Sequence, residues 1–136
     1  MNAKRLYWPI LIVCLTMTIQ TNAACPANST SGRWEMTIRS MNTNSLRYCF
    51  LKVNSRGVII QKDSKCFRHF GHAIGTNPIY SGTIRPKPSC SIIGNIKLGE
   101  GFQTRLSGQL ARKKGMMTGW IDDPTGFKGT FTAIKY

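Results

Sequence analysis

The sequence predicts an all-β domain, an antiparallel up-and-down meander that closes into a barrel of about eight strands. Three observations support this: a glycine-centred repeat, turn residues between its copies, and no long helical periodicity after residue 23. In the repeat, a glycine lies midway between two apolar residues that are four positions apart. The five copies occupy residues 80–84, 92–96, 106–110, 117–121 and 127–131.

Each copy of this repeat predicts one short β-strand whose glycine lies on the inner face, because side chains two positions apart share a side of a strand. Successive glycines are 12, 14, 11 and 10 residues apart, a spacing that suits short strands joined by tight turns. Glycine on an inner face relieves crowding where a sheet coils sharply. We therefore expect a curved sheet, closed so that no edge is exposed.

The first half of the chain begins with an irregular lead-in over residues 25–31. Residues 33–39 then alternate, with Trp34, Met36 and Ile38 on one face and polar side chains on the other. This alternation predicts a strand that has one buried side and one side in water.

The second expected strand covers residues 46–53, and its apolar face begins at Cys49. Residues 54–57 form a turn that ends in glycine, and residues 58–61 form the expected third strand. Residues 62–78 show the least regular pattern, and we expect an irregular segment there.

The separators between the glycine-centred strands each contain glycine or proline, as tight turns do. Together the expected strands number eight or nine, in sequence order. The separators are residues 85–88, 98–101, 111–115 and 122–126.

Residues 1–23 have the layout of a secretory signal peptide. Lys4 and Arg5 give the positive start, an apolar stretch follows, and small residues lead to Ala23, after which we place the cleavage. The apolar stretch is shorter than the roughly 20 residues of a membrane-spanning helix. We therefore expect residues 24–136 to be a single exported domain, periplasmic or extracellular, with no transmembrane span after the signal is removed.

Four of the five cysteines belong to this expected domain, an even number that predicts two disulfides in a small exported protein. Of the three available connectivities we favour Cys49–Cys66, which flank an apparent hairpin, and Cys25–Cys90 by elimination. A zinc site is the competing interpretation, and the lack of a Cys-x-x-Cys pair disfavours it. We expect no cofactor and no metal.

The chain is strongly basic. Removing Lys4 and Arg5 with the signal lowers the formal net charge from +14 to +12. Such a charge attracts anionic surfaces, so the expected partner is a protein or an anionic polymer or lipid surface of the cell envelope. A basic surface that serves only solubility is the alternative interpretation.

The Gly-x-Trp motif at residues 32–34, followed by the meander, resembles the opening of calycin-type barrels, which include lipocalins, avidins and small secreted protease inhibitors. The resemblance implies that the tryptophan packs across the barrel base beside a basic residue of the last strand, a role that Lys135 would take. The order of this motif, then Cys49 and Cys66, is similar to that of bacterial metalloprotease inhibitors of the barrel type.

Basic residues on two expected turns are the first candidate binding residues. Arg112, Lys113 and Lys114 form the densest basic cluster, and Arg85 and Lys87 lie on another turn. If both turns lie at one end of the barrel, these side chains could form one contact site for an anionic partner. The alternative is a pair of solvated turns kept charged for solubility.

Trp120 is the remaining candidate binding residue. The alternation that buries Met117 and Ile121 directs Trp120 outward, beside Met116. An outward tryptophan on a small barrel is either covered by the lead-in or a loop, or available to a partner.

His69 and His72, with Lys65 nearby, indicate an alternative function as a secreted nuclease, because imidazole transfers protons near pH 7 and lysine holds phosphate. Residues three apart on a strand face opposite sides, however, and no carboxylate lies close in sequence to orient either ring. We therefore expect a binding protein rather than an enzyme.

Two further alternatives remain. A secreted protease inhibitor would use an N-terminal segment, such as residues 21–31, or a barrel loop to block an active site. An outer-membrane barrel would need a lipid-facing last strand, and Lys128, Thr130 and Thr132 share a face there with Ile134, which disfavours it. The sequence predicts a small, disulfide-stapled, exported β-barrel that acts by binding.

Overall fold

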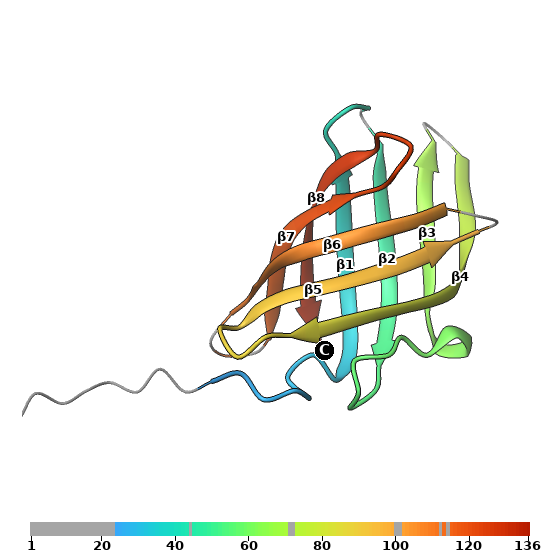
Figure 1. The fold of residues 1–136 in the computed structure, drawn as a ribbon. Coiled ribbons are helices and arrows are strands. Elements are labelled where there is room, and N and C mark those ends of the chain that lie inside the picture. The colour runs from blue at the N-terminus through green and yellow to red at the C-terminus, as the bar shows by residue number, and fades with distance from the viewer. Residues whose placement is uncertain (1–23, 44, 71–72, 100–101, 112, 114) are drawn as a thin grey trace, which may run out of the picture.

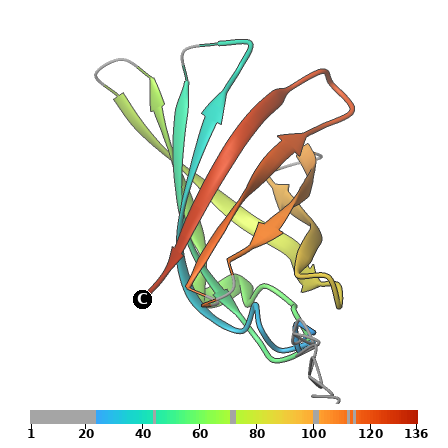
Figure 2. The same ribbon diagram turned by 90° about the vertical axis from the view of Figure 1, so that its left-hand side faces the viewer.

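The structure, a computed structural model, describes residues 24–43, 45–70, 73–99, 102–111, 113 and 115–136. Within these residues, eight strands follow one another along the chain, and each pairs antiparallel with the next. β8 also pairs antiparallel with β1, which closes the barrel (Figures 1 and 2). The strands are β1 (Gly32–Ser40), β2 (Leu46–Val53), β3 (Lys65–Phe70), β4 (Ala73–Pro86), β5 (Ser91–Leu98), β6 (Phe102–Leu110), β7 (Met116–Asp122) and β8 (Lys128–Lys135).

The predicted all-β meander and its closure are therefore confirmed. Turns alternate between the two ends of the barrel, as the meander requires. We call one end the base: it holds the lead-in, the C-terminus and the β2–β3, β4–β5 and β6–β7 connections. We call the other end the mouth: it holds the remaining four hairpin connections (Figures 1 and 2).

The predicted third strand over residues 58–61 is wrong. In that range only Val58 and Ile59 form bridges, opposite Thr83 and Val53 respectively. The chain then passes through a short 3-10 helix, η1 (Gln61–Asp63), and β3 lies within the segment expected to be irregular. The physical reason is the length of β4: its 14 residues cannot all pair with the six residues of β3, so the bridging segment pairs with the part of β4 nearer the base.

The inward glycines allow neighbouring strands to approach closely. Gly108 of β6 lies directly opposite Gly119 of β7. A Cβ atom added at Gly108 would lie 2.8 Å from the Cα atom of Gly119, and one added at Gly119 would lie 2.5 Å from the Cα atom of Gly108. No other residue type fits at either position without moving the backbone.

Tyr80 departs from the predicted repeat. It is 45% exposed, although its place in the repeat predicts an inward side chain. The pairing of β4 with β5 shifts between Ile79 and Ser81, and this irregularity reverses the alternation. Ile79 is buried in place of Tyr80.

Trp34 seals the base of the barrel. Its side chain is fully buried, and its indole Nε1–H donates a hydrogen bond of 2.7 Å to the carbonyl oxygen of Thr30. The Lys135 Nζ atom lies 5.5 Å from the centre of the indole ring, a cation–π contact. The position that the calycin resemblance implies for these two residues is therefore observed. Other fully buried apolar residues are Met36, Ile38, Leu51, Ile79, Ile84, Ile92, Ile96, Leu110, Met117 and Ile121.

Both predicted disulfides are confirmed. Cys49 and Cys66 lie directly opposite each other on β2 and β3. The bond between Cys25 and Cys90 fastens the lead-in to the β4–β5 turn, where the Cys25 N–H also donates to the carbonyl oxygen of Pro88. Two such bonds suit an oxidising environment.

The predicted signal peptide, residues 1–23, lies outside the described residues. In the part of the chain that the structure describes, no helix has the length and apolar character needed to span a membrane.

Replacing Gly108 with alanine tests the close approach of β6 and β7. The added methyl group overlaps backbone of β7, so we expect the free energy of unfolding to fall by about 1–3 kcal/mol. Urea denaturation measures this change. Gly115→Ala is the matched control, because a Cβ atom there meets only one atom, 4.0 Å away; an equal loss in both variants would refute the explanation.

Candidate binding surface

The β4–β5 and β6–β7 turns lie at the same end of the barrel, the base (Figure 1). The backbone N–H of Leu110 donates to the carbonyl oxygen of Cys90 over 2.8 Å. The side-chain amide of Gln109 also donates to the carbonyl oxygen of Ser89 over 3.2 Å. The β4–β5 turn is therefore linked to the end of β6, and the two turns that carry the predicted basic residues share one end of the barrel.

The predicted basic residues divide into two groups. Arg85, Lys87 and Lys113 are exposed, on the end of β4, the β4–β5 turn and the β6–β7 turn respectively. Arg112 and Lys114 lie outside the described residues. The structure thus places three of the five predicted cations at one end of the barrel.

Trp120 faces outward from β7, as predicted, and 58% of its surface is exposed. Met116 lies four residues before Trp120 on the same face of β7, and it is also exposed. The lead-in, which is fastened at the base, leaves most of Trp120 accessible.

Two rows of outward side chains cross β4 to β7 next to Trp120. In the first row, Arg85 lies opposite Ile93, Ile93 opposite Ser107, and Ser107 opposite Trp120. Ile93 is 48% exposed. The small Ser107 side chain therefore stands between two large apolar ones and forms a low point between them.

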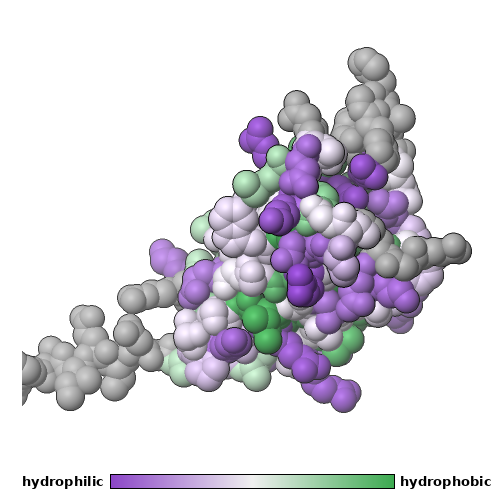
Figure 3. Space-filling view, turned by 45° about the horizontal axis from the view of Figure 1, so that its top comes forward, coloured by the Kyte–Doolittle hydropathy of each residue, from purple (hydrophilic) through white to green (hydrophobic). Residues whose placement is uncertain are grey.

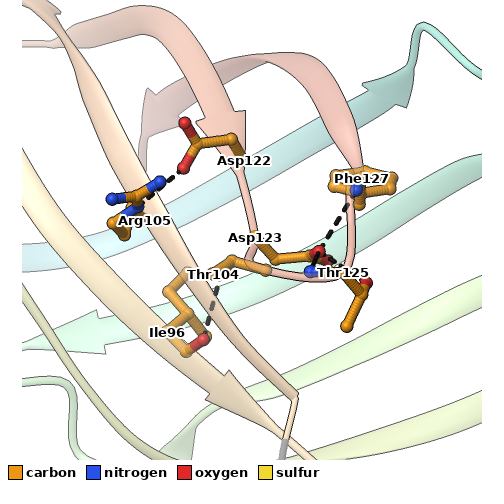
Figure 4. A network of polar contacts seen from close by, with 7 residues as sticks. All are labelled: Ile96, Thr104, Arg105, Asp122, Asp123, Thr125 and Phe127. Atoms are coloured by element: carbon orange, nitrogen blue, oxygen red, sulfur yellow. Dashed lines mark hydrogen bonds and ion pairs between the residues drawn. The ribbon is translucent and has the colours of Figure 1, made fainter.

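The second row runs parallel to the first, two residues nearer the mouth. Asn95 lies opposite Arg105, and Arg105 opposite Asp122. The Arg105 Nε–H donates to Asp122 Oδ1 over 2.9 Å (Figure 4). This exposed ion pair contributes little to stability, but it orients the guanidinium group along the surface.

The two rows line an open groove of about 600 Å³ on the outer face of the sheet. Gln103 and Thr83 complete its polar rim. Figure 3, which looks obliquely onto the side of the barrel that faces the viewer in Figure 1, shows a small apolar patch enclosed by hydrophilic side chains. The groove thus combines an aromatic ring, an aliphatic side chain, two arginines and several hydrogen-bonding groups.

A second cluster lies inside the mouth. Arg47 and Arg68 occupy inward positions directly opposite each other on β2 and β3, and Arg47 is only 7% exposed. The Arg47 guanidinium lies 5.4 Å from the centre of the Phe127 ring. Burial, followed by the positive charge of Arg68, lowers the pKa of Arg47, and the carboxylate of Asp123 opposes that shift.

Asp123 organises the β7–β8 turn beside this cluster. Its Oδ1 atom accepts hydrogen bonds from the Thr125 N–H (2.7 Å), the Thr125 hydroxyl (2.6 Å) and the Phe127 N–H (3.1 Å), as Figure 4 shows. Its Oδ2 atom is buried and makes no hydrogen bond within the described part of the chain. The predicted turn chemistry of residues 122–126 is therefore centred on Asp123.

Sequence reasoning missed the inward arginines for two different reasons. Arg47 precedes Cys49, Leu51 and Val53 on the same face of β2. The same alternation, extended two residues toward the start of the strand, would have predicted that Arg47 faces inward. Arg68 belongs to β3, which the sequence pattern did not reveal as a strand. The groove residues Ile93, Ser107 and Arg105 were missed because their meeting with Trp120 depends on the register of β5, β6 and β7.

The structure describes the predicted nuclease residues only in part. His69 lies on β3 opposite Leu46 and Ile74, and His72 lies outside the described residues. Lys65 is exposed, with its Nζ atom 5.4 Å from the centre of the Phe67 ring. Among the described residues, no group of three or more histidine, cysteine, aspartate and glutamate side chains could hold a metal ion.

Comparisons with known proteins support the fold alone. No protein-family model matches the chain, and no curated protein matches it significantly. A de novo designed fluorescence-activating β-barrel is similar in structure, with a TM-score of 0.52 and 13% sequence identity. The match covers 78% of this chain and 93% of the designed one. The class that is supported is therefore a small β-barrel, and the calycin resemblance stays a prediction.

Replacing Asp123 with alanine tests the mouth turn. The turn N–H groups and the Thr125 hydroxyl lose their acceptor, so we expect the free energy of unfolding to fall by about 1–3 kcal/mol. Asp123→Asn keeps an oxygen that can accept these bonds and should lose less. Thermal denaturation of both variants measures the effect, and equal losses would show that the negative charge, rather than the turn, is what matters.

Proposed function

We propose that this chain is an exported binding protein whose partner is an anionic polymer. The polymer contacts the β4–β5 and β6–β7 turns together with Arg85 at the end of β4, which we call the base turns, and the adjoining groove. The observation that carries the proposal is that Arg85, Lys87 and Lys113 are all exposed at the base, on the end of β4 and on the β4–β5 and β6–β7 turns. The two disulfides support export, because such bonds persist in oxidising compartments.

The charge balance of this region supports an anionic partner. Arg105 and Lys97 extend the basic surface from the base turns along the outer face of the sheet. Asp122, the acidic residue that lines the groove, is already engaged by Arg105. The region therefore presents a surplus of positive charge, which raises the local concentration and the association rate of anionic ligands.

Two other candidate functions compete with binding. An inhibitor that acts through its N-terminal segment needs that segment free, whereas Cys25 is bonded to Cys90 and the Thr30 hydroxyl donates to the carbonyl oxygen of Ile84. The nuclease hypothesis needs His69 and His72 at one site, and His72 lies outside the described residues. Both functions stay predictions of the sequence.

Chromatography on immobilised heparin tests the proposal. The full chain, expressed with its leader and purified, should bind at low salt and elute as salt screens the contacts. The triple variant Arg85→Gln/Lys87→Gln/Lys113→Gln should elute at clearly lower salt than the parent, because it lacks the cations of the base turns.

The matched control is Arg39→Gln/Lys62→Gln/Lys65→Gln, which loses the same charge from β1, η1 and β3. It should elute close to the parent protein. Identical elution of the two triple variants would show that net charge alone causes retention, and an absence of retention would refute the proposal. If the protein bound acidic vesicles or an acidic protein more tightly than heparin, that partner would replace the anionic polymer in the proposal.

A further inference from the structure

The groove beside Trp120 contains more than positive charge. Its first row places Ile93 and Trp120 on either side of Ser107, and its second row places Asn95 and Arg105 alongside. A surface that only attracted polyanions would need the arginines but neither the exposed indole nor the low point. These features therefore indicate a ligand that has a shape as well as a charge.

The strand spacing gives the dimensions of the groove. Ile93 and Trp120 lie on β5 and β7, two strand spacings apart, so their backbones are separated by about 10 Å. The two rows are two residues apart along each strand, which is about 7 Å. A space of this size holds one six-membered sugar ring with its substituents, next to the indole of Trp120.

The lining groups match the chemistry of an acidic sugar. Indole offers a large apolar face, against which the C–H face of a pyranose ring can pack. Asn95, Gln103 and Ser107 carry the amide and hydroxyl groups that hydrogen-bond sugar hydroxyls. Arginine binds planar carboxylate, and similarly sulfate oxygens, through paired N–H donors; Arg85 and Arg105 lie on opposite rows of the groove.

The ion pair with Asp122 prepares Arg105 for such a contact. It uses the Nε–H of Arg105 and leaves the two terminal amino groups outside the bond. The Arg105 side chain is 71% exposed, so these amino groups are accessible to a ligand. A guanidinium that is already oriented loses less conformational freedom when it binds.

We propose that the groove binds a linear acidic polysaccharide, one ring of which packs on Trp120 while its carboxylate or sulfate groups contact Arg85 and Arg105. This inference rests on the proposed function, since the base turns supply the general attraction for the polymer and the groove selects its rings. Lys87 and Lys113 then contact the acidic groups of neighbouring sugars.

Single-stranded nucleic acid is the competing polyanion, and the groove suits it less well. Proteins that bind single strands without sequence preference stack successive bases on several aromatic side chains. Trp120 is the one aromatic side chain that lines this groove among the described residues. The amide and hydroxyl groups around it instead suit a ring that carries many hydroxyls.

Titration calorimetry with three probes tests the inference on the full chain. The probes are a heparin-derived hexasaccharide, inorganic polyphosphate of equal charge and a dT oligonucleotide. We expect Trp120→Ala to weaken hexasaccharide binding about tenfold and to change polyphosphate binding less than twofold. Trp120→Phe keeps a ring and should retain most of the affinity for the hexasaccharide.

Two further variants separate the groove from general effects. Ser107→Phe fills the low point between Ile93 and Trp120 at an exposed position. It should weaken binding of the hexasaccharide but not of polyphosphate or the dT oligonucleotide. Tyr80→Ala removes an exposed aromatic residue that does not line the groove and should leave all three affinities unchanged.

The outcomes distinguish this inference from the proposed function. If Trp120→Ala and Ser107→Phe leave hexasaccharide binding unchanged while the base-turn variant weakens it, the inference fails and the proposed function stands. If the dT oligonucleotide binds most tightly and depends on Trp120, the ligand is nucleic acid and the inference fails. If none of the probes binds the parent protein, both fail.

Discussion

The close approach of β6 and β7 at Gly108 and Gly119 is the constraint on which this barrel depends. These glycines lie opposite each other and leave no space for a Cβ atom on either side. A short sheet must bend sharply to bring its last strand back to its first, and inward glycines permit that bend. The pairing of β8 with β1, and the burial of Trp34 beneath them, follow from this closure.

The candidate binding surface is the outer side of the same strands. The central glycine and the apolar residues two positions away face inward, so the intervening residues face outward and meet in rows across β4 to β7. The row that joins Ile93, Ser107 and Trp120 has a large, a small and a large side chain in sequence. The register that the barrel requires thus also produces the groove.

The sequence predicted those features that depend on local alternation and on chemistry within one strand or turn. The outward position of Trp120, the buried face of β1 and both disulfides are examples. It failed where pairing between distant strands decides the structure. The irregular register of β4 turned the Tyr80 side chain outward instead of inward. Two segments pair with β4, and for this reason the sequence pattern did not show β3 as a strand. The groove could not be predicted, because no pattern within one strand shows which side chain of the next strand lies beside it.

Nuclear Overhauser effects between backbone protons of paired strands test the central claim most directly. The closed barrel predicts cross-strand signals between β6 and β7 at Gly108 and Gly119, and between β1 and β8 at Ile38 and Phe131. Signals at both places would establish that the glycine-lined sheet closes on itself. Signals between β6 and β7 without any between β1 and β8 would show an open sheet and contradict this account.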